Sequence, residues 1–480
     1  MADFKNELDG VVHSAAHLSK RHVHPKLLKM FEMGGMNAVF ERAENQYLWD
    51  VEGNRYLDLL SGGGVYFAGR NNPMVHEYLK AVLDSKLPNL SIVNASLLGG
   101  MLAEKLLKLA GPHYGKVIFA NTGTEATEVA IRFARYVTRR RRFLYLDKAF
   151  HGRTYAAISL CGDPHLREGQ DPMMPTCTCI RPNDLKELRK ELKYGDVAAV
   201  FVEPVQGMSC EVMSDEYMRE VESLCEQYGT LFVADEVQTG LARTGSWFRS
   251  NAVGARPHIM TVSKTLSGGH MPVSAVLVSE EIYQKVYERF QSGPFYFSTF
   301  AENNLAMAAG IATLDFLEEM DAPAVAERLG NQLFAGLNEL ASRYDVIEKV
   351  VGKGLMAAVY FKDSAKPMLS AEQKMLNMAD SAAFAAAVNV DMYKKHHILV
   401  QIPGVGVNAI KVLPPVTCTP EDITTFVNAL DDILATYYQG RGPVRSLSEG
   451  VVGAAMKQAR SLVPSQLLSG FGGDSEKKNL

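Results

Sequence analysis

A carboxylate and an amine stand at the ends of two apolar segments in the middle of the chain. Residues 231–234 are apolar enough for a buried strand, and Asp235 and Glu236 follow them at once. A second apolar run, residues 259–263, ends at Lys264. Because functional groups collect at the carboxyl ends of parallel strands in α/β sheets, we expect Asp235 and Lys264 to face one crevice. An acid that keeps a pyridine nitrogen protonated and a lysine that forms a Schiff base are the groups that pyridoxal-phosphate chemistry requires.

That chemistry gives each of these residues, and a neighbouring amide, a distinct role. Asp235 would pair with the pyridinium nitrogen, so that the ring accepts electrons when a Cα proton leaves. Gln238 would hydrogen-bond the phenolic oxygen of the ring. Lys264 would also serve as the base that moves a proton between the substrate Cα and the cofactor. An isolated Asp or Lys is usually a surface charge, but the two at successive strand ends favour a catalytic site.

A glycine-containing turn follows another apolar run, residues 116–120. Thr122 and Glu125 have the Thr-x-x-Glu spacing of a helix capping box. A strand, a short turn and a capped helix start expose backbone N–H groups and the positive end of the helix dipole, which together bind anions. Gly123 lets the backbone approach a ligand closely, and Thr124 adds a hydroxyl donor, so the segment predicts a phosphate site. A plain strand-to-helix turn explains these residues equally well.

Two further segments that follow apolar runs carry an aromatic ring, a cation and a carboxylate. Phe150 can stack on a flat cofactor ring, and Arg153 can bind a carboxylate. A single Phe is more often a core residue and a single Arg a surface residue, so only their company makes them candidates. Glu203 is either a loop charge or a group that supports the site. A third strand end that delivers a polar group to one crevice favours the second role.

The elements that must position these residues alternate along the chain. Between about residues 75 and 320, helical periodicities alternate with apolar runs, at 116–120, 143–146, 197–202, 231–234, 259–263 and 273–278. This alternation predicts an α/β fold with a mostly parallel sheet and helices on both faces. Residues 47–58 alternate around Gly53 and Asn54, which predicts a β-hairpin.

The last third of the chain predicts a smaller α+β domain. Strands are expected within residues 347–361, 397–402 and 408–413, helices near 322–343, 380–395 and 420–438, and a loop or short helix at 364–379. We therefore expect four parts: an N-terminal segment that contributes to the small domain (1–70), a large cofactor-binding domain (71–325), the small domain (326–438) and a tail of unknown role with a disordered end (439–480).

The composition is that of a globular protein. Of 480 residues, 47% are hydrophobic and 22% are charged, and the net charge of −4 argues against a nucleic-acid partner. The six cysteines are scattered, which predicts free thiols in a reducing compartment and no metal site. The N-terminus is too polar for a secretory signal, and no apolar stretch approaches the roughly 20 residues of a membrane helix. We therefore expect a cytoplasmic protein without a membrane partner.

Together these segments resemble the class III (ω-type) aminotransferases, fold-type I pyridoxal-phosphate enzymes such as ornithine, acetylornithine and γ-aminobutyrate aminotransferases. The similarity covers about residues 35–438 and runs in order through 47–58, 121–130, 150–154, 203–207, 235–240, 263–272, 298–300 and 411–415. The resemblance implies a large domain with a mostly parallel seven-stranded sheet, a smaller α+β domain, and a homodimer with shared active sites.

The resemblance also implies how the cofactor is held. The phosphate would bind the amides of Gly123 and Thr124, with Thr299 supplied by the other subunit. Phe150 would stack on the ring, and Glu203 would flank its oxygen beside the amide described above.

The positions that bind substrate in this family depart from its pattern. Lys411 stands where many relatives have an arginine that forks onto the substrate α-carboxylate, and lysine is no bidentate substitute. Met208 stands where several relatives have a glutamate that pairs with that arginine. Met208 and residues 65–67, with Tyr66 at their centre, predict an apolar substrate pocket, so one substrate is expected to be an amine, a diamine or a long apolar aldehyde or ketone. A carboxylated donor would still have Arg153 or Lys411.

Three functions compete. The first is a ping-pong aminotransferase that uses an amino donor and an aldehyde or keto acceptor. The second is an aminomutase, racemase or decarboxylase on the same scaffold, although an aminomutase tends to have Met where Gln238 stands. The third, a binding protein without catalysis, would require a broken site, and no break is visible in the sequence.

Overall fold

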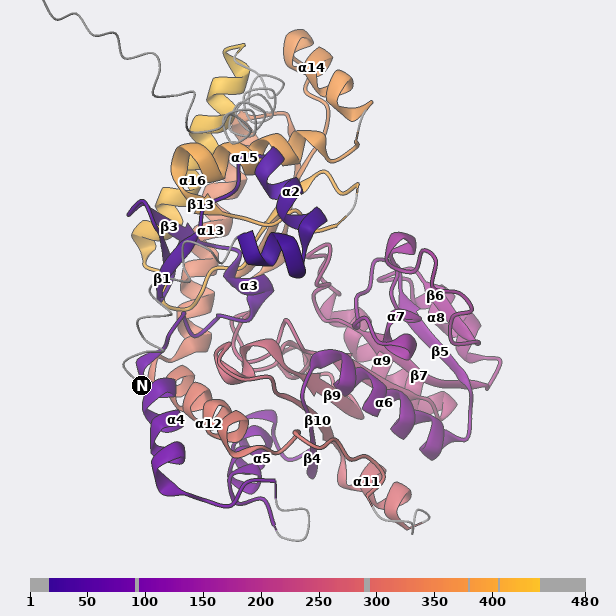
Figure 1. Cartoon of the computed structure of the whole chain (residues 1–480). Helices are drawn as coiled ribbons and strands as arrows, with labels where there is room; N and C mark the ends of the chain where they lie inside the picture. The colour runs from indigo at the N-terminus through magenta and orange to yellow at the C-terminus, as the bar shows by residue number, and fades with distance from the viewer. Residues whose placement is uncertain (1–16, 91–94, 289–293, 379, 405, 441–480) are drawn as a thin grey trace, which may run out of the picture.

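The core of the molecule is a seven-stranded sheet, seen in a computed structural model that describes residues 17–90, 95–288, 294–378, 380–404 and 406–440 (Figure 1). The strands lie side by side in the order β4 (Lys116–Ala120), β10 (Ser274–Val278), β9 (Ile259–Val262), β8 (Leu231–Asp235), β7 (Val197–Val202), β5 (Arg142–Leu146) and β6 (Cys177–Ile180). β10 runs antiparallel to both neighbours, whereas all pairs from β9 to β6 are parallel. The predicted mostly parallel sheet is therefore confirmed.

Helices cover both faces of this sheet. They are α5 (Leu97–Ala110), α6 (Gly123–Thr138), α8 (Leu185–Leu192), α9 (Asp215–Tyr228), α11 (Glu280–Tyr287) and α12 (Asn304–Glu319). A further helix, α4 (Pro73–Ser85), packs on α12. Successive strand residues point to opposite faces, so Phe143 and Tyr145 pack with α6 while Leu144 and Leu146 pack with α8 and α9. Short turns connect these elements: α3 (Ser61–Gly64), α7 (Tyr155–Ile158), α10 (Arg249–Ala252), η1 (Pro164–Leu166) and η2 (Lys264–Ser267).

Two smaller sheets join the ends of the chain. One has the order β1 (Phe40–Glu44), β2 (Tyr47–Asp50), β3 (Arg55–Asp58) and β13 (Ile398–Leu399), and the other the order β11 (Ile347–Lys353), β12 (Met356–Phe361) and β14 (Ala409–Val412). β13 pairs parallel to β3, so the N-terminal hairpin becomes part of the C-terminal unit. The helices here are α2 (Pro25–Met33), α13 (Ala322–Arg343), α14 (Pro367–Asn377), α15 (Ala383–His396) and α16 (Pro420–Tyr438).

Most expected elements are present, with two differences. β6 was not expected, because an edge strand that is only partly buried lacks a strong apolar run. The strand expected at 397–402 is limited to β13, since Gln401 makes only a single bridge to Lys411. Of the loop or short helix expected at 364–379, the structure has the helix, α14. The predicted tail lies outside the described residues beyond Gly440, and the domain limits expected from the sequence stay a prediction.

Within the described part of the chain, no helix is both long and apolar enough to cross a membrane. The same residues contain no cluster of three or more His, Cys, Asp or Glu side chains that could hold a metal ion.

Candidate active site

Residues at the carboxyl ends of four neighbouring strands line one cavity of about 900 Å³. Asp235 is the last residue of β8, Glu203 follows β7, and Lys264 follows β9. Phe150 and His151 follow β5 across the short loop after Leu146. The parallel register sets these strand ends level, because Ala199 lies opposite Leu231 and Asp235 lies opposite Thr261. The crevice expected from the sequence is therefore present.

Asp235 is a buried carboxylate held by three donors. Its Oδ2 lies 2.7 Å from His151 Nδ1, and its Oδ1 accepts hydrogen bonds from Val237 N (3.1 Å) and Thr261 Oγ1 (3.2 Å). Burial by itself raises the pKa of Asp235, but the hydrogen bond and positive charge of His151 and the Val237 N–H outweigh burial and lower it. The carboxylate is thus kept ionised although only 5% of the residue is exposed.

His151 was missed by the sequence analysis, although it follows Phe150 directly. Burial lowers its pKa, but the hydrogen bond to Asp235 and the charges of Asp235 and Glu203 raise it above the ordinary value. Its other ring nitrogen, Nε2, is buried without a hydrogen-bond partner among the described residues. A histidine that follows an aromatic residue just after a strand end was the available signal.

Lys264 faces the cavity with an uncommitted amine. It begins the 3-10 turn η2 with a left-handed φ of +40°, a strained conformation for a side chain of this size. Burial lowers the pKa of Lys264, although the charges of Asp235 and Glu203 oppose this. Its Nζ makes no hydrogen bond to another described residue. A partly desolvated amine of this kind is suited to attack an aldehyde.

The start of α6 supplies backbone donors at the cavity wall. Thr122 is the N-cap and its Oγ1 accepts from Glu125 N (3.3 Å). The Glu125 carboxylate accepts from Asn121 N (2.6 Å) rather than from the N-cap N–H, so only half of the predicted capping box forms. The backbone N–H groups of Gly123 and Thr124 have no acceptor among the described residues, as an anion site requires.

The loop after β5 packs tightly on this helix start. Thr124 Oγ1 accepts from Thr154 N (3.1 Å) and lies 2.7 Å from Thr154 Oγ1. A Cβ added to Gly152 would lie 2.8 Å from the Thr124 Cα, so only glycine allows this approach. Since the Thr124 hydroxyl is already engaged, the backbone N–H groups are the donors left for a ligand.

Glu203 fixes the loop that carries the aromatic residue. Its two carboxylate oxygens accept from Phe150 N (2.9 Å) and Gly207 N (2.7 Å). Burial raises its pKa, although the positive charge of His151 opposes this.

Gln238 and Lys411 form a connected pair that also reaches Gly207. Lys411 Nζ donates to Gly207 O and to Gln238 Oε1 (2.9 Å), and Gln238 Nε2 donates to Gly63 O (2.8 Å). Lys411 is 1% exposed, and burial lowers its pKa to about 8. Met208 and Arg153 line the same cavity, Arg153 from its exposed rim.

Tyr66 and Thr299 lie outside this cavity. The Tyr66 ring packs against Gly269, and its centre lies 4.0 Å from the Arg70 guanidinium carbon. Tyr66 is not among the residues that line the cavity around Lys264. The sequence could not reveal the position of Tyr66, because only the fold brings Gly269 against its ring.

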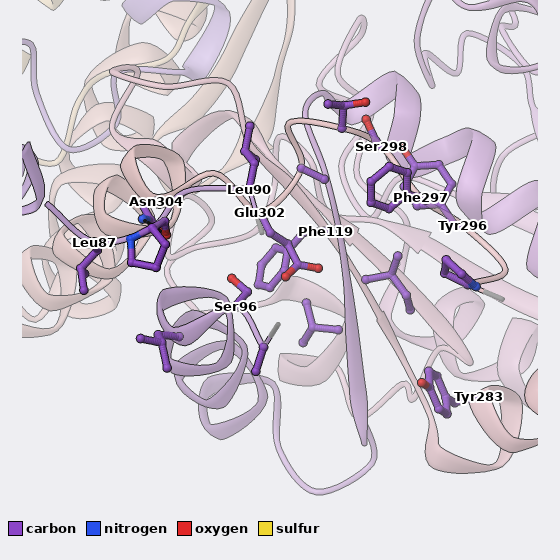
Figure 2. A pocket seen from close by; sticks show the side chains of 18 of the residues that line it. Leu87, Leu90, Ser96, Phe119, Tyr283, Tyr296, Phe297, Ser298, Glu302 and Asn304 are labelled. Atoms are coloured by element: carbon purple, nitrogen blue, oxygen red, sulfur yellow. Dashed lines mark hydrogen bonds between the residues drawn. The ribbon is translucent and has the colours of Figure 1, made fainter. Parts of the chain in front are cut away.

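Thr299 lines a second cavity, of about 430 Å³, between α5, β4 and the segment before α12 (Figure 2). Five aromatic rings contribute to its wall, among them Phe119, Tyr296 and Phe297. Phe297 and Phe300 are 55% and 61% exposed, an unusual exposure for phenylalanine.

A buried arginine, Arg243, connects three segments that are far apart in the sequence. The guanidinium of Arg243 donates to Leu355 O (3.0 Å), Pro414 O (2.6 Å) and Gly64 O (3.3 Å) and lies 4.2 Å above the Phe67 ring. Burial lowers its pKa to about 9, and it has no carboxylate partner among the described residues.

A family profile described as Aminotransferase class-III matches residues 31–434. The chain belongs to the class III aminotransferases. It is 33% identical over 407 residues to the mitochondrial ornithine aminotransferase of Rattus norvegicus, which covers 83% of this chain and 86% of that protein. It is 28% identical over 452 residues to the aminotransferase PigE of a Serratia strain, covering 87% of this chain. The chain spans only about half, 53%, of PigE.

Solved structures support the same assignment. An ornithine aminotransferase from Toxoplasma gondii superposes with a TM-score of 0.73 at 26% identity, covering 84% of this chain and 91% of that one. An amine transaminase from an uncultivated Pseudomonas species, in its PLP-bound form, gives 0.72 at 27% identity, covering 83% and 94%. All four of these similar proteins are named as aminotransferases or transaminases.

Class III aminotransferases depend on pyridoxal phosphate, so the cofactor expected from the sequence is confirmed. The residues present fit this group on three counts. The ionised Asp235 suits a pyridinium nitrogen, the uncommitted Lys264 amine suits the aldehyde, and the free N–H groups at the start of α6 suit the phosphate.

Proposed function

We propose that the enzyme transfers an amino group between an amino donor and an aldehyde or keto acceptor by a ping-pong mechanism, with an ω-amine or an apolar carbonyl compound as one substrate. Bound pyridoxal phosphate supplies an electron-accepting ring. The protein supplies the binding, the orientation and the proton transfer.

Two residues are assigned the central chemical roles. Lys264 Nζ takes the proton from the substrate Cα, for which its lowered pKa prepares it. Asp235 holds the ring nitrogen protonated, and His151 keeps that carboxylate ionised and oriented. The phosphate is assigned to the backbone N–H groups of Gly123 and Thr124.

The remaining cofactor contacts follow from the cavity wall. Phe150 is assigned to the face of the ring, where Glu203 holds its backbone in place. Gln238 and Glu203 are assigned to the side of the phenolic oxygen. These roles rest on the position of each residue around the cavity and on the resemblance to the family.

The substrate proposal rests on one observation: Lys411 is already hydrogen-bonded to Gly207 O and Gln238 Oε1. A buried lysine committed to two protein oxygens is a poor receptor for a substrate carboxylate. Met208 lines the cavity nearby, together with the apolar side chains of Leu166 and Ile402. This wall favours a substrate whose far end is apolar or carries no α-carboxylate, while Arg153 at the rim is left to bind a carboxylated partner substrate.

We further propose that the active unit is a homodimer in which Thr299 reaches the phosphate of the partner. In its own chain Thr299 lines a different cavity from Lys264. The exposed rings of Phe297 and Phe300 beside it provide apolar surface for a second copy.

The test is to record the visible absorbance of the purified protein while adding glutamate, alanine, putrescine or a long-chain alkylamine singly. We expect putrescine or the alkylamine to convert the visible band to a near-ultraviolet band, with formation of the matching aldehyde. Lys264→Ala should abolish the visible band. Conversion by glutamate and alanine alone would contradict the substrate proposal, and a visible band that no amine converts would contradict the transfer reaction itself.

A further inference from the structure

Lys411 is held rigidly between two segments of the small sheets. It lies on β14, where its backbone pairs with Ala358 of β12 on one side and exchanges two hydrogen bonds with Gln401 on the other. Its side chain crosses to the large sheet and reaches Gly207, after β7, and Gln238, after β8. The position of the amine is therefore fixed by β14, whereas its hydrogen-bond partners follow strands of the large sheet.

The ammonium group settles which way the Gln238 amide points. A lysine ammonium only donates hydrogen bonds, so the atom of Gln238 that faces it must be the carbonyl oxygen. The Nε2 group then faces the opposite way, where one of its two hydrogens is donated to Gly63 O. The second hydrogen is left for a ligand in the cavity, which Gln238 lines.

We propose that Lys411 is a positioning residue, which acts through Gln238 to direct an N–H donor at the bound cofactor instead of binding a substrate carboxylate. This inference rests on the proposed role of Gln238 at the cofactor. Without Lys411 the amide loses one of the two contacts that fix its rotation, so its remaining N–H is presented to the cofactor only part of the time.

The test is a double-mutant cycle on cofactor affinity, with full-length protein freed of cofactor and titrated with pyridoxal phosphate. Lys411→Met and Gln238→Leu should each raise the Kd about tenfold, the effect of one lost hydrogen bond. The double variant should match Gln238→Leu alone, because Lys411 has nothing left to position. Lys349→Met, a half-exposed lysine on β11 of the same sheet, is the control and should change the Kd less than twofold.

A second measurement separates positioning at the cofactor from a merely structural role. The pH midpoint of the visible band should rise by about half a unit or more in Lys411→Met, because a nearby cation is removed. The titratable groups that act on Lys411 are Cys210, Lys264, Glu203 and Arg243, and all remain in the variant. If Lys411→Met does not fold, Lys411→Leu, which is also uncharged and has no hydrogen-bond donor, is taken through the same two measurements.

The outcomes are distinct. Additive losses in the double variant, or an unchanged Kd with an unchanged midpoint, would overturn the positioning role. A wild-type protein that binds no cofactor would overturn the proposed function instead.

Discussion

Asp235 can serve a pyridinium nitrogen only while its carboxylate is ionised, and at 5% exposure burial opposes that state. His151 resolves the conflict, because it places a donor and a positive charge 2.7 Å from the carboxylate. Substituting one member of this pair should destabilise the fold, because the other member then remains as a buried charge without a partner.

We predict that His151→Leu lowers the free energy of unfolding by about 3–5 kcal/mol at pH 6, measured by urea denaturation. His165→Leu, at an exposed position, is the control and should change it by less than about 0.5 kcal/mol.

The difference in the free energy of unfolding between wild type and His151→Leu should depend on pH in a defined direction. The pKa of Asp235 is lowered from 3.8, so its contribution is present above that value and is lost as the pH falls through the lowered pKa. The pKa of His151 is raised from 6.5, so its contribution is complete below 6.5 and is lost as the pH rises through the raised pKa. The difference between wild type and His151→Leu should therefore be largest between pH 3.8 and pH 6.5 and shrink as the pH rises through the raised pKa of His151. A difference that grows with rising pH would contradict the ion pair.

At the level of secondary structure, the junction between β4 and α6 determines whether the proposed phosphate donors are in place. Thr122 caps the helix through Glu125 N, and the N–H groups of Gly123 and Thr124 are left without an acceptor among the described residues. The glutamate binds one residue further back than a full capping box requires, so the N-cap hydroxyl is the single side-chain cap at this end.

We predict that Thr122→Ala lowers the free energy of unfolding by about 1 kcal/mol and weakens cofactor binding. Urea denaturation and cofactor titration measure the two effects. Thr425→Ala, an exposed threonine inside α16 that only bonds back to Glu421 O, should leave both within experimental error. Equal effects of the two substitutions would argue against the capping role.

Strand ends were predictable from the sequence because an apolar run that stops at a charged residue marks both the strand and its functional end. Asp235 and Lys264 were placed correctly in one crevice for this reason. The hydrogen bonds of the Lys411–Gln238 pair were not predictable, since Gly207 O, which accepts from Lys411, and Gly63 O, which accepts from Gln238, are backbone atoms that carry no mark in a sequence. β6 was missed because an edge strand needs little apolar character.

At the scale of the whole molecule, the proposed homodimer would bring together two cavities that are separate within one chain. One holds the chemistry around Lys264, and the other presents Thr299 beside exposed aromatic rings. If the molecule is a dimer, each copy completes the site of the other, and association becomes a condition for cofactor binding.

We predict that the double substitution Phe297→Asp and Phe300→Asp converts the protein from dimer to monomer in sedimentation velocity, because two charges cannot be buried in an apolar interface. Cofactor affinity should fall in parallel, since a monomer no longer receives Thr299 from a partner chain. Met375→Asp, at a position on α14 that is 63% exposed, should change neither. A wild-type protein that sediments as a monomer with full cofactor affinity would rule out the shared site.

The anchoring of Arg243 bears on how freely the surrounding sequence can change. Its donors reach the carbonyl oxygens of residues 64, 355 and 414, and a carbonyl oxygen is present whichever amino acid stands there. As far as this contact is concerned, positions 355 and 414 can change, provided that the backbone keeps its path, whereas position 64 has a φ of +94° that favours glycine. The arginine has no such freedom, because lysine would offer one point charge where a planar fork now meets three oxygens. At this junction the requirement for a particular side chain therefore falls on Arg243.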